Sequence, residues 1–512
     1  MSIRRVLLCG ALLAIAGCQR SEAPNPAATP EAHDVESSRP AGIAWFDGGP
    51  EAAFTAAKAK NMPVLLYWGA VWCPPCHLLK ATVFAQPEFQ GKTKLFIPVY
   101  LDGDDAGAQR WGDQFKVSGY PTLVALRPDG TEIKRISGGL DLGRYGAMLD
   151  DALEDQRPAR DVLTAAARSA AGATAENCRR IAWNAWDLDD AYSARDPELA
   201  KQLLAAAEHC AKVNSTLELR LRLYAAAALI PAQAPPAGAA FGASSQANAR
   251  RLEALMADTA AVVPELDALR TLEPVFFTAY SRQNQAAALR LASLCEAAEL
   301  KAAQDPRFPR ADQLGALLLA LEMRDALQDD DSQQAALRKS ARDRLAAEMT
   351  DLPQDPYLRS GVVMAVLEAM YAIGDYPAAY DIARREVQSS HYAYYFMSDM
   401  GLICEKLGRN EEALNWYERG YRESKGPATR FQWGTSYLLA LMRLAPDDLQ
   451  RIRTAGREVL GELNSQGGVF RRSRTRLQRL DAGVNEWSAA RPALRNPVAT
   501  ELRSAAAQAG RS

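Results

Sequence analysis

The chain has 512 residues, too many for one compact core, so its length indicates two or three domains. Its 60 Lys and Arg residues are interspersed with 62 Asp and Glu residues, and the balance gives no basic footprint for nucleic acid. Alanine is abundant and β-branched residues are scarce beyond about residue 150, which favours helix for most of the length.

Residues 1–18 have the features of an export signal. Arg4 and Arg5 precede an apolar run, Val6 to Ala16, that is too short to span a bilayer but fits a secretory signal. Its end, Ile15-Ala16-Gly17-Cys18, resembles the lipobox of bacterial lipoproteins, which implies lipid attachment at Cys18, and Gln19 implies sorting to the outer membrane. An ordinary signal peptide with an unrelated cysteine is the alternative. The expected location is the cell envelope, with the chain anchored in the membrane and facing the periplasm.

Residues 19–41 form the next segment. They contain four prolines among small and polar residues and have almost nothing apolar to bury. This composition predicts a flexible linker between the anchor and the first domain.

Residues 42–155 alternate between helical and extended patterns. The strands are predicted at 64–69, 95–101, 122–127 and 131–136, and the helices at 50–60, 78–84, 106–115 and 142–153. Pro128-Asp129-Gly130 predicts a tight turn, so the last two strands should form an antiparallel hairpin, whereas strands separated by helices should pair in parallel. The predicted fold is an α/β sheet covered on both faces.

The motif Trp72-Cys73-Pro74-Pro75-Cys76-His77 lies between the first predicted strand and the helix that follows. The helix N-terminus should favour the Cys73 thiolate, which makes Cys73 the expected nucleophile. Cys76, one turn later, is placed to attack a mixed disulfide and release the partner. The pattern therefore predicts a redox-active pair.

Two other interpretations of the cysteine pair were weighed. A zinc knuckle needs two further ligands, and the sequence has no second Cys-x-x-Cys pair. An inert structural disulfide remains an alternative. We expect no metal and no cofactor. His77 is expected on the exposed face of the helix, because the residue after a helical cysteine points away from it.

Together with Gly119-Tyr120-Pro121-Thr122, the cysteine motif resembles the thioredoxin superfamily, in particular the thioredoxin-like ends of thiol:disulfide interchange proteins. The resemblance implies that Pro121 is cis beside the cysteines and that Tyr120 and Trp72 contact an extended substrate. It also implies protein thiols or disulfides and a redox partner as ligands. A trans proline that starts a strand is the alternative.

The sequence departs from this family at two positions that matter for proton transfer. Tyr67 stands where thioredoxins commonly bury an Asp, and Pro98 stands at about the position of their nearby lysine. Another group must then move the proton of Cys76.

Residues 156–512 are predicted to form a larger all-α region of helical hairpins, with a break between Pro231 and about residue 246. Two segments, Gly374–Ala379 and Gly408–Ala413, are offset by 34 residues, and residues 360–445 therefore resemble tetratricopeptide repeats. Such a stack either binds a peptide or protein on its concave face or serves as a scaffold for the redox domain. Tyr392, Tyr394, Tyr395 and Phe396 fit a groove or a core.

Four cysteines remain in the helical region. Cys178 and Cys210 fall on what read as neighbouring helices, so they are candidates for a structural disulfide in an oxidising compartment. Cys295 and Cys404 are far apart in sequence and are expected to be buried free thiols.

These features predict a membrane-anchored envelope thiol–disulfide oxidoreductase that reduces disulfides in exported proteins. Disulfide formation is the alternative direction. A different class of function is a non-enzymatic binding or assembly lipoprotein whose two domains are docking surfaces.

Overall fold

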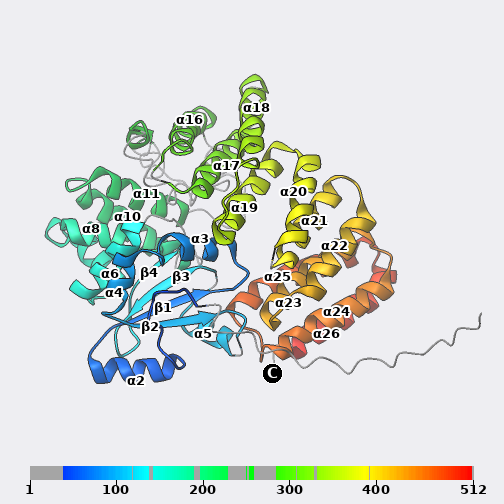
Figure 1. Cartoon of the computed structure of the whole chain (residues 1–512), viewed down its shortest axis with the longest axis horizontal. Helices are drawn as coiled ribbons and strands as arrows, with labels where there is room; N and C mark the ends of the chain where they lie inside the picture. The colour runs from blue at the N-terminus through cyan, green and yellow to red at the C-terminus, as the bar shows by residue number, and fades with distance from the viewer. Residues whose placement is uncertain are drawn as a thin grey trace, which may run out of the picture. The chain divides into compact units, whose positions relative to one another are not determined.

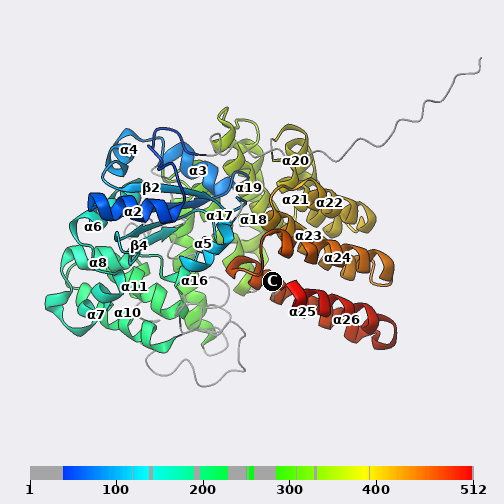
Figure 2. The same ribbon diagram turned by 90° about the horizontal axis from the view of Figure 1, so that it is seen from below.

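The computed structural model describes residues 39–105, 107–117, 119–137, 142–189, 196–228, 250, 253–258, 284–306, 308–327, 331–390 and 392–509. The predicted signal with Cys18, most of the linker and the break at 231–246 lie outside these residues. The described residues form an α/β domain followed by a larger all-α region, which confirms the predicted fold class (Figures 1 and 2). Within the described ranges, no helix combines the length and the apolar character needed to cross a membrane.

The sheet has four strands in the order β2-β1-β3-β4. The strands are β1 (Val64–Gly69), β2 (Ile97–Asp102), β3 (Thr122–Leu126) and β4 (Glu132–Ser137). β1 pairs in parallel with β2, but β3 runs antiparallel to both β1 and β4.

The prediction that strands separated by a helix pair in parallel is therefore wrong for β1 and β3. The connection from β2 to β3 contains one helix, α5 (Ala108–Gln114), of 7 residues. A helix of this length spans about 10 Å, and a six-residue strand spans about 20 Å, so the chain does not return to the end of the sheet where β1 and β2 begin. As a result, β3 begins at the end of the sheet where β1 ends, with Thr122 opposite Trp68.

Helices cover both faces of the sheet. On one face, Leu65 and Tyr67 of β1 pack with α3 (Pro74–Thr82), α4 (Pro87–Thr93) and α6 (Leu142–Glu154). On the other face, the alternate residues Leu66 and Trp68 pack with α2 (Pro50–Lys60) and α5. The strict alternation along β1 is what a doubly covered strand requires.

A buried ion pair ties the sheet to the first helices beyond it. Lys134 Nζ of β4 lies 2.6 Å from Asp151 Oδ2 of α6, and both side chains are almost fully buried. Arg179 of α8 (Ala175–Ala182) reaches the other carboxylate oxygen at 2.6 Å. Burial lowers the pKa of Lys134 to about 8 although Asp151 favours its charge.

The first part of the helical region is a small bundle. It consists of α7 (Ala159–Arg168), α8, α10 (Pro197–Cys210) and α11 (Ser215–Ala228), with the short 3₁₀ turns η1 (Ala170–Gly172) and η2 (Trp186–Leu188). Its core is made mostly of small and aliphatic side chains, with Trp186 and Tyr224, around a disulfide between Cys178 and Cys210. The structure thus joins the two cysteines that the sequence proposed as partners.

The second part is a succession of helices in which neighbours along the chain pack together (Figure 1). Its helices are α16 (Gln285–Ala302), α17 (Arg310–Leu327), α18 (Asp331–Glu348), α19 (Pro356–Ile373), α20 (Tyr376–Ser389), α21 (Ala393–Lys406), α22 (Asn410–Glu423), α23 (Pro427–Leu444), α24 (Leu449–Ser465), α25 (Arg471–Ala490) and α26 (Pro492–Ala509).

The 34-residue offset seen in the sequence recurs in this succession. α20 and α22 have equal lengths, and their first residues are 34 positions apart. The first residues of α21 and α23 are also 34 positions apart. Gly374 and Gly408 both have φ of 74°, the left-handed conformation that ends a helix before the next one starts.

Helices of the second part also pack on the α/β domain. α19 packs against α3, the helix of the cysteine motif, and the two lie side by side in both views (Figures 1 and 2). α25 packs against α5, where the Arg471 backbone N–H donates to Asp113 Oδ1. These contacts bring residues far apart in sequence onto the cysteine motif.

Candidate active site

The two cysteines of the motif stand at the start of α3 as free thiols. Cys73 is the N-cap residue of the helix, and its Sγ accepts the backbone N–H of Cys76 at 3.3 Å. Pro74 occupies the first helical position, where a missing N–H is tolerated and the fixed φ favours the helix. The sequence therefore places both sulfurs within one helical turn.

Neither thiol is open to solvent. Cys73 is 3% exposed and Cys76 is 0% exposed. They form one apolar cluster with Ala70, Trp72 and residues of α21 and α23. The members contributed by the helical region or its margins are Val387, Tyr392, Ala393, Tyr394, Tyr395, Met397, Trp416 and Trp433. Five of these residues lie on α21 or α23. Together with Arg472 of α25 we call them the helical cover: Ala393, Tyr394, Tyr395, Met397 and Trp433.

Trp72 is in contact with aromatic rings of both regions. Its ring centroid lies 6.0 Å from that of Tyr120, 6.0 Å from that of Tyr395 and 5.9 Å from that of Trp433. The guanidinium of Arg472 lies 4.0 Å from the Tyr120 ring centroid and 5.7 Å from that of Trp72, within the range of cation–π attraction.

The Tyr120–Pro121 peptide bond is cis, as the resemblance implied. Tyr120 lies in the loop that leads into β3, and its ring faces Trp72 edge-on. The structure thus brings Trp72, the Tyr120–Pro121 loop and the cysteines to one edge of the sheet. The helical cover thus contacts Trp72 and Tyr120, the residues predicted to contact the substrate.

A buried carboxylate anchors the cover. Asp104 accepts hydrogen bonds from Trp72 Nε1 at 2.7 Å, from Thr429 Oγ1 at 2.6 Å and from the Thr429 backbone N–H at 3.1 Å. Gly426 precedes Thr429 with φ of 77°, and a Cβ there would lie 2.5 Å from Asp104. Burial and neighbouring Asp102 raise the pKa of Asp104 to about 6, against the lowering effect of these hydrogen bonds and Arg472.

The two thiols titrate as one unit in this buried site. Burial and the hydrogen bond between the thiols raise the pKa of Cys73 well above its ordinary value. Burial also acts to raise the pKa of Cys76, but its hydrogen bonds and the charge of Lys80 hold it below the ordinary value. The first thiolate is therefore stabilised by the other thiol, and a second charge beside it is strongly disfavoured. The Cys76 backbone N–H at the helix N-terminus acts to lower the pKa of Cys73, but burial and the neighbouring thiol outweigh it while the cover is in place.

Residues 50–153 match the family model of a thioredoxin-like domain. These residues form a thioredoxin-like domain. The chain is 32% identical over 99 residues to a thiol:disulfide interchange protein DsbD of Pseudomonas fluorescens, covering 19% of this chain and 17% of the relative. It is also 32% identical over 133 residues to DsbD 2 of Pseudomonas aeruginosa, covering 24% of this chain and 21% of that protein.

A third relative, DsbD 1 of Pseudomonas aeruginosa, is 27% identical over 95 residues, covering 18% of this chain and 16% of its own length. The chain thus spans only about a fifth of each of these relatives. The chain is thus similar to thiol:disulfide interchange proteins over about a hundred residues, and residues 50–153 are thioredoxin-like.

Lys80 acts electrostatically on the thiols of the thioredoxin-like domain and Asp102 acts on Lys80, and sequence reasoning did not identify either. Lys80 is one turn beyond Cys76 on α3; burial lowers its pKa although Cys76 and Asp102 favour its charge. Asp102 accepts hydrogen bonds from Tyr100 Oη at 2.9 Å and from the Val71 backbone N–H at 3.1 Å, and burial raises its pKa. The spacing of Lys80 and Cys76 on one helix face was the signal available in the sequence.

Tyr67, which replaces the family's buried acid, lies on β1 beside the thiols. Its hydroxyl is buried and donates toward the sulfur of Cys76, which helps to lower the pKa of that thiol. Its pKa is raised by burial, with a further contribution from the charge of Cys76. A tyrosine in this state does not supply the negative charge of the family's carboxylate.

The expectation that His77 lies on an exposed helix face is wrong. Its side chain is 4% exposed because α19 packs on α3 at this point. One ring nitrogen, Nε2, lies 2.5 Å from the Val71 carbonyl, and Nδ1 lies 3.1 Å from Ser360 Oγ. Burial lowers the pKa of His77 to about 4, so the ring is neutral near pH 7 and carries no charge to stabilise a thiolate.

Cys295 and Cys404 are both free and buried, in separate parts of the helical region. Across the described residues, no cluster of three or more His, Cys, Asp or Glu side chains is arranged to hold a metal ion. The pair on α3 is where two free thiols meet in this part of the chain.

Proposed function

We propose that the protein is a cell-envelope thiol–disulfide oxidoreductase, anchored through a lipid on Cys18, that reduces disulfides in exported proteins. The observation that carries the proposal is the pair of adjacent thiols at the start of α3, beside Trp72 and the cis Tyr120–Pro121 loop. The similarity to thiol:disulfide interchange proteins supports the same chemistry. The lipobox-like end of the signal and Gln19 support an outer-membrane anchor facing the periplasm.

The reaction balances without a cofactor. The Cys73 thiolate attacks one sulfur of a substrate disulfide, forms a mixed disulfide and releases the other substrate sulfur, which takes a proton. Cys76 then loses its proton and attacks Cys73 Sγ, which releases the second substrate thiol. Two electrons pass to the substrate and a Cys73–Cys76 disulfide is left, which an external dithiol partner must reduce.

The cover sets a condition on this mechanism. Because Cys73 is 3% exposed, a substrate disulfide reaches its sulfur only when Tyr395, Trp433 and their neighbours move off Trp72. Opening also returns water to the thiols and so removes the burial that raises the pKa of Cys73. Access and formation of the attacking thiolate are thereby linked.

Reduction of insulin by a soluble form beginning at Gln19 tests the proposal. Cys73→Ser should abolish turnover, and Cys76→Ser should accumulate mixed disulfides that mass spectrometry detects. Cys404→Ser, which removes a buried thiol far from α3 in sequence, is the matched control and should remain active. Full activity of the Cys73→Ser variant would contradict the proposal.

A glutathione redox titration of the Cys73–Cys76 pair tests the direction. We expect a reduction potential of about −270 mV, as for a reductase. A reduction potential of about −120 mV would indicate a protein that forms disulfides.

The burial of the dithiol favours one other function, a binding or assembly lipoprotein in which the helical region permanently occupies the substrate face. In that case the soluble form would not reduce insulin, and Cys73 and Cys76 would stay unreactive to alkylation after treatment with a reductant. Reactivity of the pair under these conditions would exclude this second function.

A further inference from the structure

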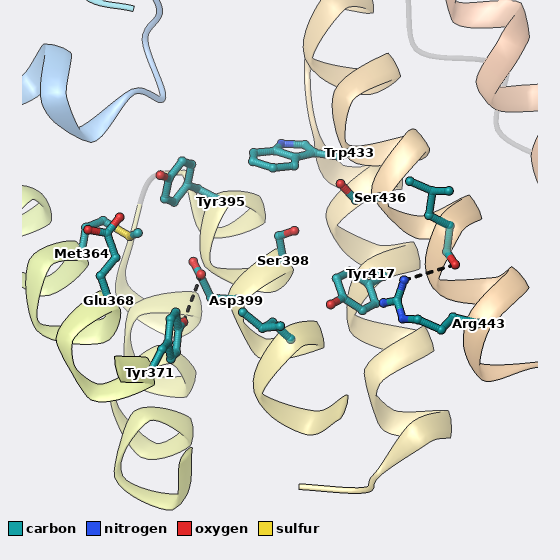
Figure 3. Close-up of a pocket in the computed structure, with 12 residues that line it drawn as sticks. Met364, Glu368, Tyr371, Tyr395, Ser398, Asp399, Tyr417, Trp433, Ser436 and Arg443 are labelled. Carbon is teal, nitrogen blue, oxygen red and sulfur yellow. Dashed lines mark hydrogen bonds between the residues drawn. The ribbon is translucent and has the colours of Figure 1, made fainter. Parts of the chain in front are cut away.

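A cavity of about 490 Å³ opens in the helices that cover the dithiol (Figure 3). Its lining residues come from α19, α21, α22 and α23. The volume is in the range of pockets that hold small ligands or peptide side chains. Since the proposed substrate face is covered, a polypeptide that reaches Cys73 must contact these same helices.

Two side chains belong both to the cavity and to the cover. Tyr395 and Trp433 line the cavity, and both rings also contact Trp72, the residue before Cys73. Their centroids are 5.8 Å apart and the rings meet edge to face. One wall of the cavity is therefore the surface that shields the cysteine pair.

The cavity lining contains two carboxyl groups, those of Asp399 and Glu368. Asp399 Oδ1 accepts a hydrogen bond from Tyr371 Oη at 3.0 Å, and the two side chains point toward one another in Figure 3. Glu368 adds a second carboxyl group. Arg443 is the one basic residue of the lining, and both its Nε and a terminal nitrogen bind Glu405, at 2.8 and 2.7 Å. Its charge is already neutralised.

The walls of the cavity are aromatic. Tyr371, Tyr395, Tyr417 and Trp433 contribute four rings. Rings beside carboxylates form the environment in which ammonium and guanidinium groups bind, because the ring faces and the carboxylate oxygens both attract positive charge. Burial raises the pKa of Asp399 to about 7, and a bound cation would favour its ionised form.

The cover also leaves one hydrogen-bond donor unused. Trp433 Nε1 is buried and has no partner among the described residues. An inserted polypeptide has backbone carbonyls that accept such a donor, so the covered state lacks a hydrogen bond that an occupied one can gain.

We propose that this cavity binds a lysine or arginine side chain of the disulfide-bearing polypeptide and so holds the disulfide beside Cys73. The inference rests on the proposed oxidoreductase function and adds to it a substrate class, disulfides flanked by a basic residue. The carboxylate of Asp399 binds the cation, and Tyr395 and Trp433 pack on the stem of the same side chain.

The test uses two synthetic peptides that share one intramolecular disulfide and differ only in a Lys or a Gln beside a cysteine. With the soluble form beginning at Gln19, we expect kcat/KM for the Lys peptide to exceed that for the Gln peptide by about tenfold, the effect of one charge-assisted hydrogen bond. Asp399→Asn should reduce this ratio to about one. Asp381→Asn, at an exposed carboxylate of α20, is the matched control and should keep it. Equal rates for the two peptides, or an unchanged ratio in Asp399→Asn, would overturn the proposal.

A binding measurement separates this inference from the proposed function. The Lys peptide with both cysteines replaced by Ser is titrated into the Cys73→Ser/Cys76→Ser variant by calorimetry. If Asp399→Asn weakens this binding about tenfold but the natural chain reduces neither disulfide peptide, the cavity is upheld and the oxidoreductase function is overturned. Turnover of both peptides with no difference in binding between Lys and Gln would do the reverse.

Discussion

Two pairs of buried cysteines in this chain have different surroundings. Cys178 and Cys210 are 32 residues apart, joined in a disulfide, and enclosed by apolar side chains of their own bundle. Cys73 and Cys76 are free thiols at one helix start, and they are enclosed by helices from a distant part of the chain. Equal burial therefore does not indicate an equal role.

The chemical groups around the two pairs also differ. The thiols on α3 have Lys80 and Tyr67 within electrostatic reach, and the cover brings the guanidinium of Arg472 over the ring of Trp72. Perturbed titratable groups beside a thiol pair are typical of sites that react. The difference supports the proposal that the dithiol reacts, whereas the disulfide joins two helices of the bundle.

The largest difference between the pairs should appear in stability. Replacing Cys178 and Cys210 together by Ala removes a link that closes a loop of 32 residues, which the chain-entropy relation values at about 3–4 kcal/mol. Replacing Cys73 and Cys76 together by Ala removes no link and should lower the free energy of unfolding by only about 1–2 kcal/mol. Urea unfolding without reductant measures both. Equal losses would contradict the assigned roles.

The cover should respond to pH, whereas the disulfide bundle should not. The pKa of Asp104 is about 6 under the cover and would return to about 4 in water, so the covered state binds the proton more tightly. This proton therefore stabilises the covered state fully below about pH 4, and the stabilisation is lost as the pH rises through about 6. Between pH 4.5 and pH 7 the cover should lose about 2 kcal/mol.

Hydrogen exchange on α21 and α23, corrected for intrinsic rates, measures this change. Protection should fall between pH 4.5 and pH 7 in the natural chain. Asp104→Asn removes the titrating group that faces Asp102 and Arg472, and its protection should fall less over this range than that of the natural chain. Protection that rises with pH in the natural chain would show that the sign of the effect is wrong.

Much of the thioredoxin-like domain could be predicted from the sequence because its signals are local. The apolar run of β1 and the helix at Pro50–Lys60 were predicted with the bounds that the structure shows, and the cysteine motif fell on the start of α3. These features depend on periodicity and on Pro and Gly within a few residues. Pairing direction was less accessible, because it depends on how far a connection reaches.

The cover could not be predicted, since it depends on which distant helix meets the motif. Thr429 and Asp104 are 325 residues apart. The sequence predicts either a groove or a core for the aromatic cluster at Tyr392 to Phe396. In the structure, three of its tyrosines pack with the dithiol. For the same reason His77 was expected in solvent, although α19 buries it.

A smaller change should weaken the cover without touching the thiols. Thr429→Val keeps the side-chain shape but removes the hydroxyl that donates to Asp104 at 2.6 Å. Loss of one hydrogen bond to a charged group should raise the alkylation rate of Cys73 about tenfold at pH 7. Thr435→Val, on the same helix, loses only the hydrogen bond that the hydroxyl donates to the Phe431 carbonyl one turn earlier, and it should leave the rate unchanged. An unchanged rate in Thr429→Val would mean that the thiols open by another route.

The smallest expected effect concerns the charge next to the dithiol. Lys80 favours the thiolate of Cys76 through its positive charge, so Lys80→Met should raise the pKa of the first thiol to ionise by about half to one unit, which corresponds to about 0.7–1.4 kcal/mol. The pH midpoint of iodoacetamide labelling measures this shift. Lys92→Met, at an ion pair with Asp150 of α6, controls for the loss of a positive charge elsewhere in the domain and should leave the midpoint in place. A midpoint that stays constant in Lys80→Met would assign the lowered pKa to the hydrogen bonds of Cys76 alone, and the dithiol would then differ from the disulfide by its cover and not by the charge beside it.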